Sequence, residues 1–285
     1  MADAVTPLFA PVRNGHTFRS AAASYIEHGG ETRYLPRIIA YLEDRPLTAI
    51  APFDIRQMAT ELYPSQSNAT RNRHAITPAR AVLSHAYDRG WGPMMRIRNF
   101  KVDKPRRKVP ASPVWMFAFL RQCEIDGLLP LAALVLFMHQ TGARVSEAIA
   151  LRWPEVDLIN RRVTLLKTKT STFSIRHLTD ELVTRVAALD RNEAKPAFGY
   201  RSRYSINDRI AAVCARADIT YKSSHLVGRH SFATNAISGG IDIKTAMDAG
   251  DWRSVSVFVE TYVHTLDASR TVADQFNAMR YDAKL

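Results

Sequence analysis

A basic, proline-containing segment near the middle of the chain constrains its folding most. Residues 101–113 read K-V-D-K-P-R-R-K-V-P-A-S-P, with five basic residues and three prolines. Because proline fixes its own φ and disfavours helix in the residue before it, no helix or central strand is expected to cross this segment. We therefore predict an extended linker over 101–113 with a separate domain on each side, in a chain of 285 residues that is long enough for two cores.

The residues before the linker predict a small all-helical domain over 16–100. Residues 1–15 lack periodicity and are expected to form a loose tail. From His16 onward, apolar residues recur at helical spacing, and the pattern stops at Gly90, Gly92 and Pro93. Further helices are expected at 34–42, at 54–62 with Asp54 as N-cap, and at 67–88. This domain carries basic helix faces and no candidate catalytic residue.

The residues after the linker predict a second domain over 114–285, mainly α with a small antiparallel β-sheet. Its periodicity changes from helical to alternating beyond Trp153 and returns to helical after Leu178. In the helix expected at 254–264, Val255, Phe258 and Val259 should face inward. The expected helices lie at 114–126, 130–140, 179–189, 205–217, 254–264 and beyond Thr265, and the expected strands near 156–158, 163–166 and 173–178.

The charge of the chain favours a polyanionic partner. Its 39 Lys and Arg residues exceed its 27 acidic residues, giving a net charge of +12, and neutralising phosphates releases counterions. A basic but unspecialised surface is the alternative. Cys123 and Cys214 lack metal-type spacing and read as core residues of an intracellular protein. The chain shows no signal peptide and no membrane-length apolar run, so we expect a soluble protein.

Four motifs in the second half together resemble the tyrosine recombinase (phage integrase) family. They are T-G-A-R-V-S-E at 141–147, the lysine-containing turn K-T-K-T-S at 167–171, G-R-H-S-F-A-T at 228–234 and T-Y-V-H at 261–264. They occur in the family's order, and the helical first half resembles the family's core-binding domain. The resemblance implies a two-domain recombinase with a helical DNA-binding domain and an α+β catalytic domain. The last twenty residues, from Thr265, also have a helical pattern, with Val272, Phe276 and Met279 on one face, and our hypothesis is that this helix docks on a neighbouring subunit.

By this resemblance, Tyr262 is the nucleophile and Arg144 and Arg229 bind the phosphate that it attacks. A phenol has a pKa of about 10 and is a weak nucleophile unless its surroundings activate it. Its target, a phosphodiester, gains negative charge in the transition state, and guanidiniums stay charged and donate two hydrogen bonds to phosphate. The resemblance therefore implies DNA cleavage through a 3′-phosphotyrosyl intermediate.

The leaving 5′ oxygen needs a proton, and a lysine in the hairpin turn is the expected general acid. The family's hairpin lysine lies seven residues before the position of Arg176, which selects Lys169. Lys167 points to the same side of an ideal strand and is the alternative.

Two positions depart from the family's commonest pattern. The usual H-x-x-R is H-L-V-G-R in this chain, so His225 is one residue further from Arg229, and Gly228 could absorb the extra residue in a tight turn. His225 should assist proton transfer or bind the phosphate, with His230 as its competitor. Trp252 lies where the family carries histidine or tryptophan, and its indole N–H can donate to phosphate but cannot transfer a proton. Glu147 is expected to orient its neighbours, and His264 to be structural.

The resemblance further implies a homotetramer on double-stranded DNA, with DNA-bending or directionality factors as further partners. No cofactor and no metal is expected, because the phosphotyrosyl bond itself conserves the energy for religation. An integrase of a phage or genomic island, acting in the cytoplasm at the nucleoid, is favoured. The alternatives are a Xer-like resolvase of chromosome or plasmid dimers and, from another class, a catalytically decayed architectural DNA-binding protein.

Overall fold

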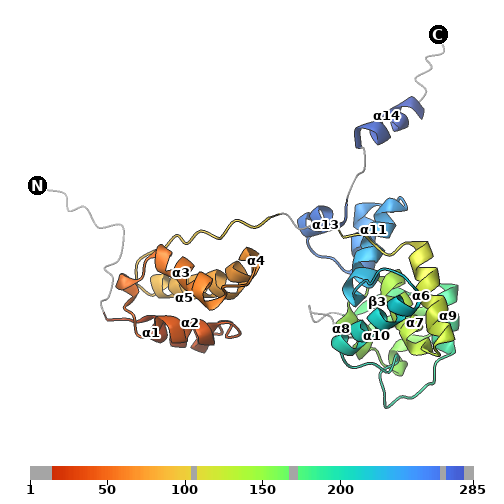
Figure 1. Ribbon diagram of the computed structural model, residues 1–285, viewed down its shortest axis with the longest axis horizontal. Helices are drawn as coiled ribbons and strands as arrows, with labels where there is room; N and C mark the ends of the chain where they lie inside the picture. The colour runs from red at the N-terminus through yellow and green to blue at the C-terminus, as the bar shows by residue number, and fades with distance from the viewer. Residues whose placement is uncertain (1–14, 104–107, 167–172, 264–267, 279–285) are drawn as a thin grey trace, which may run out of the picture. The chain divides into compact units, whose positions relative to one another are not determined.

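The computed structural model describes residues 15–103, 108–166, 173–263 and 268–278 (Figure 1). The chain divides into two compact units, one up to Arg106 and the other from Arg107 onward. Each unit has its own core of buried apolar residues. The division falls within the segment 101–113, where the proline pattern predicts a linker.

The N-terminal unit, coloured red to orange in Figure 1, is built from short helices. A π-helical turn separates its last two α-helices, so the long helix predicted at 67–88 is one continuous path with a wider turn inside it. The elements are α1 (Phe18–Glu27), α2 (Leu35–Leu42), the 3-10 turn η1 (Leu47–Ala49), α3 (Pro52–Leu62), α4 (Asn68–Arg71), the π turn η2 (Asn72–Ile76) and α5 (Thr77–Asp88).

Local capping and an apolar core explain these helices. At the start of α1, Thr17 Oγ1 accepts from the Ser20 N–H and Ser20 Oγ accepts from the Thr17 N–H, at 3.2 and 3.0 Å, which satisfies two donors that a helix start leaves free. The predicted N-cap of α3 is wrong. Because Pro52 suits the first helical turn, α3 begins there, and Asp54 Oδ2 instead accepts from the Ala51 N–H at 2.8 Å.

An extended segment after α5 is held against the N-terminal unit by side chains. Asn72 forms a pair of hydrogen bonds with the backbone of Phe100, at 2.9 and 2.8 Å. Asn68 donates to the Lys101 carbonyl at 2.8 Å, and Arg80 donates to the Ile97 carbonyl at 2.6 Å. Ile97 is buried in the core of this unit, and Asn68 binds the backbone of Lys101. The chain therefore belongs to this unit at least as far as Lys101.

The C-terminal unit combines helices with a three-stranded antiparallel sheet in the order β1-β2-β3. The predicted fold class, mainly α with a small antiparallel sheet, is confirmed. The elements are α6 (Pro113–Ile125), α7 (Leu129–Thr141), α8 (Val145–Ala150), η3 (Trp153–Glu155), β1 (Val156–Asp157), β2 (Arg162–Leu165), β3 (Ser174–His177), α9 (Asp180–Ala187), α10 (Arg203–Arg216), the π turn η4 (Leu226–His230), α11 (Ser231–Ser238), α12 (Ile243–Gly250), α13 (Val255–Tyr262) and α14 (Ala268–Ala278).

Helix α7 is the centre of this unit. Every residue from Leu131 to Met138 is buried, and the helix packs against α6, α9, α11 and η4. A helix that is apolar all round has to be enclosed, and these neighbours enclose it. It ends at Gly142, which adopts a left-handed conformation with φ of 66°, and a Cβ there would lie 2.8 Å from Phe232. The end of α7 is thus fixed two residues before Arg144.

Helix α13 differs from its predicted orientation. Phe258 and Tyr262 are buried, whereas Val255 and Val259, which were expected to face inward, are 58% and 37% exposed. The two buried residues are four positions apart and share one face of the helix. Aromatic packing around Phe258 therefore decides which face is covered, and it covers the face that carries Tyr262.

Both cysteines are free thiols in the core, as their apolar surroundings predict. Burial raises the pKa of Cys123 to about 12. Among the described residues, no helix is long and apolar enough to cross a membrane.

Candidate active site

Arg144 is placed by the junction of α7 and α8. It is the N-cap residue of α8, and its backbone N–H donates to Glu147 Oε2 at 2.7 Å. Its guanidinium donates to Glu147 Oε1 at 2.6 Å. The Glu147 side chain is almost fully buried, whereas that of Arg144 is 31% exposed. Glu147 therefore orients Arg144, as expected, and leaves part of the guanidinium accessible.

Arg229 is buried and tied to the backbone of two segments. Its guanidinium donates to the carbonyls of Gly142, Gly250 and Asp251, at 2.8, 2.6 and 3.1 Å. Burial, followed by the charge of Arg144, lowers its pKa to about 10, so it remains a cation at neutral pH. Within the described parts of the chain, carbonyls are its hydrogen-bond partners, so the direct partners leave the charge uncancelled.

The π turn η4 absorbs the extra residue between His225 and Arg229. Gly228 has φ of −85° and ψ of −108°, outside helical values, and a Cβ there would lie 2.7 Å from Met138 Cβ. One inserted residue in a helix produces such a wide turn. Gly228 thus absorbs the insertion, but in a π turn that lies against α7 and not in a tight turn.

Tyr262 lies at the C-terminal end of α13 within a group of aromatic rings. It is 6% exposed, and its ring lies 5.1 Å from that of His230, 5.2 Å from Phe258 and 5.5 Å from Trp252. Trp252 contacts both the Tyr262 ring and the Arg229 guanidinium. The structure therefore brings together Tyr262 and Arg229, which lie 33 positions apart in the sequence. His230 packs locally, as expected of the competitor to His225.

Trp252 bridges Arg229 and Tyr262. The Arg229 guanidinium carbon lies 3.6 Å from the centre of the indole, and Phe232 stacks near the ring with centroids 6.1 Å apart. A Cβ on Gly250 would lie 1.7 Å from this indole, so only glycine fits there. The indole face therefore holds the guanidinium by a cation–π contact, in addition to the phosphate role that sequence predicts.

His225 precedes η4 and is exposed to solvent. Although the residue as a whole is exposed, partial burial of the imidazole, followed by the charges of Lys108, Arg229 and Arg203, lowers its pKa from the ordinary imidazole value. A neutral imidazole can accept a proton at neutral pH, which suits the assisting role predicted for it.

The predicted general acid lies outside the described residues. Lys169 and its alternative Lys167 both belong to 167–172, between β2 and β3, and His264 also lies outside them. The strands on either side are described, and Leu165 pairs with Ser174.

Sequence reasoning gave no role to two charged residues of this site. Asp251, in a left-handed conformation, places a carboxylate oxygen 3.9 Å from the Arg144 guanidinium. Arg176 is 4% exposed, and burial lowers its pKa, while the charges of Glu147 and Asp251 oppose that shift. The sequence signal for Arg176 was the alternation of β3, in which Ile175 is exposed and Arg176 is buried.

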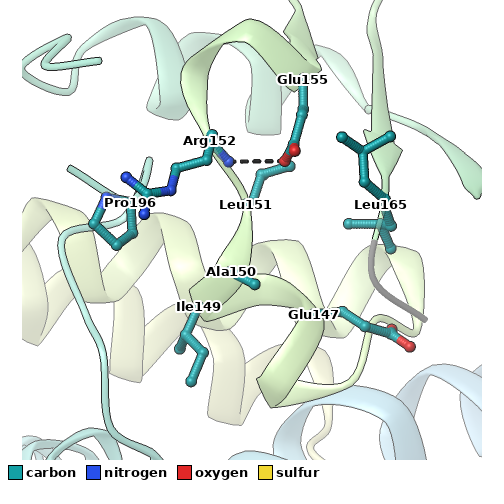
Figure 2. Close-up of a pocket in the computed structure, with 9 residues that line it drawn as sticks. Glu147, Ile149, Ala150, Leu151, Arg152, Glu155, Leu165 and Pro196 are labelled. Carbon is teal, nitrogen blue, oxygen red and sulfur yellow. Dashed lines mark hydrogen bonds between the residues drawn. The ribbon is translucent and has the colours of Figure 1, made fainter. Parts of the chain in front are cut away.

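A pocket beside α8 is distinct from this arrangement. Figure 2 shows the Glu147 carboxylate pointing away from Ile149 and Pro196. The pocket encloses about 150 Å³, and Glu147 is the one residue of the candidate site that lines it. Across the described residues there is also no group of three or more His, Cys, Asp or Glu side chains that could hold a metal ion.

The Phage integrase family model matches residues 118–269, which is more than half of the chain. The chain therefore belongs to the phage integrase family. The match covers α7, α8, η4 and α13, the elements that position Arg144, Arg229 and Tyr262.

Individual relatives agree with this assignment. The tyrosine recombinase XerD of Bifidobacterium longum (strain NCC 2705) is 31% identical over 151 residues, which are 46% of this chain and 48%, about half, of that protein. The Tn1549 transposon integrase, solved in complex with circular intermediate DNA, matches 91% of this chain and 99% of its own, with a TM-score of 0.69 and 18% identity. A lambda integrase dimer bound to a core site covers 85% and 97%, with a TM-score of 0.64 and 16% identity. These structures share the fold.

Proposed function

We propose that this chain is a site-specific DNA recombinase that cleaves and rejoins DNA through a 3′-phosphotyrosyl intermediate. The observation that carries the proposal is the contact of Trp252 with both Arg229 and Tyr262, at 3.6 and 5.5 Å. Trp252 thereby holds a guanidinium, which is charged at neutral pH, and a phenol in one aromatic cluster. Attack on a phosphate requires a nucleophile together with a cation that stabilises the developing charge. Arg144, with its accessible guanidinium, supplies a second cation.

In the proposed reaction, Tyr262 Oη loses its proton to a base or to water and forms a bond to phosphorus, while the bond from phosphorus to the DNA 5′ oxygen breaks. Arg144 and Arg229 stabilise the negative charge that grows on the other phosphate oxygens. The 5′ oxygen leaves with a proton from a general acid, for which we propose Lys169, with Lys167 as the alternative. His225 assists proton transfer or binds the phosphate, and Trp252 positions Arg229. Attack by a 5′ hydroxyl of a partner strand reverses the step and completes strand exchange.

Covalent capture from a pool of DNA sequences tests this function. The protein is incubated with nicked duplexes of randomised sequence, and DNA that stays linked under denaturing conditions is recovered and sequenced. We expect an adduct that Tyr262→Phe abolishes and Tyr221→Phe, at an exposed tyrosine, retains. An adduct that survives Tyr262→Phe would overturn the assignment of the nucleophile. Absence of any adduct would instead favour the decayed, architectural protein.

The favoured role is that of an integrase for a phage or mobile genomic element, acting as a homotetramer on two attachment sites. The fold shared with a transposon integrase along 91% of the chain supports this role. The similarity to XerD favours the second candidate, a resolvase of chromosome or plasmid dimers. Mapping the captured sequences separates the two, because an integrase selects an element end and a different host site, whereas a resolvase selects copies of one site.

The net charge of +12 supports binding to double-stranded DNA. We place the protein in the cytoplasm at the nucleoid, with DNA-bending or directionality factors as further partners and no membrane. Light scattering of the protein with the captured DNA should give the mass of a tetramer on two duplexes, and a complex that stays monomeric on one duplex contradicts the assembly.

A further inference from the structure

Arg176 occupies a position that an apolar side chain would fill in an ordinary sheet. It pairs across the sheet with Val163, which is 2% exposed, and its own side chain is 4% exposed. The neighbouring Ile175 faces outward and is 45% exposed. Since a shift by one residue would turn the isoleucine inward, packing alone would favour that residue at the inner position. The packing of the sheet therefore does not explain why an arginine is buried at this position.

The Arg176 guanidinium has few direct partners. Nη1 donates to Ser174 Oγ at 2.6 Å. Nε and Nη2 are buried, and neither has a hydrogen-bond partner among the residues that the structure describes. Arginine carries five N–H donors and does not lose its proton in a protein, so this charge is buried with most of its bonding capacity unused. Each such group calls for an explanation outside packing.

The charges around Arg176 provide that explanation. The carboxylates of Glu147 and Asp251 act on it favourably and Arg144 acts on it unfavourably. Arg144 in turn contacts both carboxylates, Glu147 at 2.6 Å and Asp251 at 3.9 Å. Among the described residues of this group, the two carboxylates would balance the charges of Arg144 and Arg229, two negative charges against two positive ones. Arg176 adds a third cation, so that the group retains an excess of positive charge.

We propose that Arg176 is a positioning residue whose buried guanidinium offsets the charges of Glu147 and Asp251 and so keeps Arg144 available for a DNA phosphate. Glu147 can then orient Arg144 without neutralising it. The backbone carbonyl of Asp251 can then bind Arg229 while its carboxylate does not withdraw Arg144 from the phosphate. This inference rests on the proposed recombinase function.

The test compares Arg176→Met, Arg176→Lys and the double variant Arg176→Met with Asp251→Asn. The probe is a captured duplex on which the unsubstituted protein forms an adduct and Tyr262→Phe does not, so failure of the recombinase function would appear first and separately. Methionine fills the inner position without charge, lysine keeps the charge, and asparagine tolerates the left-handed conformation of Asp251 while removing its charge. Single-turnover adduct formation at saturating DNA, DNA affinity and thermal unfolding are measured for each.

We expect Arg176→Met to slow adduct formation by about 10- to 100-fold, with DNA affinity unchanged and an unfolding temperature no lower than before. Arg176→Lys should stay within about threefold of the unsubstituted protein. Adding Asp251→Asn to Arg176→Met should recover at least about tenfold, because it restores the excess of positive charge. A purely structural arginine would lower the unfolding temperature and would gain nothing from Asp251→Asn.

The inference is overturned if Arg176→Met reacts at the unsubstituted rate, or if Asp251→Asn fails to raise the rate of Arg176→Met. If the methionine variant does not fold, Arg176→Gln takes its place, alone and with Asp251→Asn. Glutamine retains an N–H for Ser174 Oγ and also lacks the charge. An unchanged rate for Arg176→Gln, or no gain in rate on adding Asp251→Asn to it, would likewise overturn the inference.

Discussion

At the scale of single residues, Arg229 combines a structural and a chemical task. It joins the end of α7 to the turn after α12 through three backbone carbonyls, and its guanidinium lies against Trp252. Lysine offers a compact charge and lacks the planar fork that reaches several acceptors at once. Charge alone therefore cannot replace this residue.

We predict that Arg229→Lys lowers the rate of adduct formation by about 100-fold or more, because the charge is no longer held where the phosphate reacts. Lost buried hydrogen bonds should also lower the free energy of unfolding by about 2 to 4 kcal/mol. Single-turnover kinetics and denaturant unfolding measure the two effects. Arg191→Lys, at an exposed arginine, is the matched control and should change neither. Equal behaviour of the two variants would contradict the prediction.

The lowered pKa of His225 predicts a specific pH dependence. Because the cation is disfavoured, the imidazole should stay neutral, and adduct formation should stay constant, as pH falls from about 7.5 to about 6.5. At lower pH, protonation should slow the reaction. Lys108→Gln removes one of the charges that lower this pKa, so the loss should then begin at a higher pH. If Lys108→Gln does not shift the pH at which the rate of adduct formation falls, a group other than His225 causes the fall. The same conclusion follows if the fall at low pH persists in His225→Gln.

At the scale of elements, the contact of η4 with α7 carries Arg229 to its place. Gly228 lies against Met138 at the only point where the path of η4 leaves helical values. The clash expected from a Cβ involves Met138 Cβ, which is attached directly to the backbone of α7 and cannot move as a flexible side-chain end could. The sequence H-L-V-G-R therefore depends on glycine at its fourth position.

We predict that Gly228→Ala lowers the free energy of unfolding by about 1 to 3 kcal/mol, since η4 and α7 must separate to admit the methyl group. The same shift moves Arg229 and should reduce adduct formation. Gly239→Ala is the matched control, at a glycine with ordinary φ where a Cβ would meet only the end of its own helix at 3.1 Å. Denaturant titration compares the two, and a cost for Gly239→Ala as large as that for Gly228→Ala would refute the proposed clash.

At the scale of the whole molecule, the chain is two units with separate cores and a further helix near its C-terminal end. The first unit extends along the segment after α5 as far as Lys101, whose carbonyl accepts a hydrogen bond from Asn68. In the second unit, the backbone of Ala111 is hydrogen-bonded to the side chains of Ser231 and Asn235. Helix α14 leaves Val272 and Phe276 more than half exposed, four positions apart on one face, and Met279 lies outside the described residues. An exposed apolar stripe of this kind suits docking on another subunit.

We predict that ending the chain after Ala268 leaves cleavage of a single captured duplex unchanged and abolishes cooperative pairing of two duplexes. Helix α14 contains none of the proposed catalytic residues, so the chemistry should survive its removal. Gel-shift and strand-exchange assays on one and two duplexes measure the two steps. Phe276→Ser in the full chain should reproduce the defect, and normal strand exchange by the truncated chain would exclude docking through this helix.

The sequence by itself determined the mainly helical fold class, and it predicted a division into two units and the residue types of a candidate site. Local physical chemistry encodes these features: proline breaks elements, helical spacing marks covered faces, and Arg, His, Trp and Tyr recur in family motifs. The inner face of α13 was predicted wrongly, because valines lie on both sides of that helix and only the aromatic cluster around Phe258 decides between them.

Only the tertiary structure decided how the charges of the site are combined. The π turn at Gly228 depends on Met138, ninety positions earlier in the chain. The group of Arg144, Glu147, Arg176 and Asp251 draws on α8, β3 and the turn after α12. Electrostatic effects depend on distance and burial, which are set by the packing of elements remote in the sequence. For this reason the sequence could name candidate residues for the site, whereas the charges that surround them became apparent only in the fold.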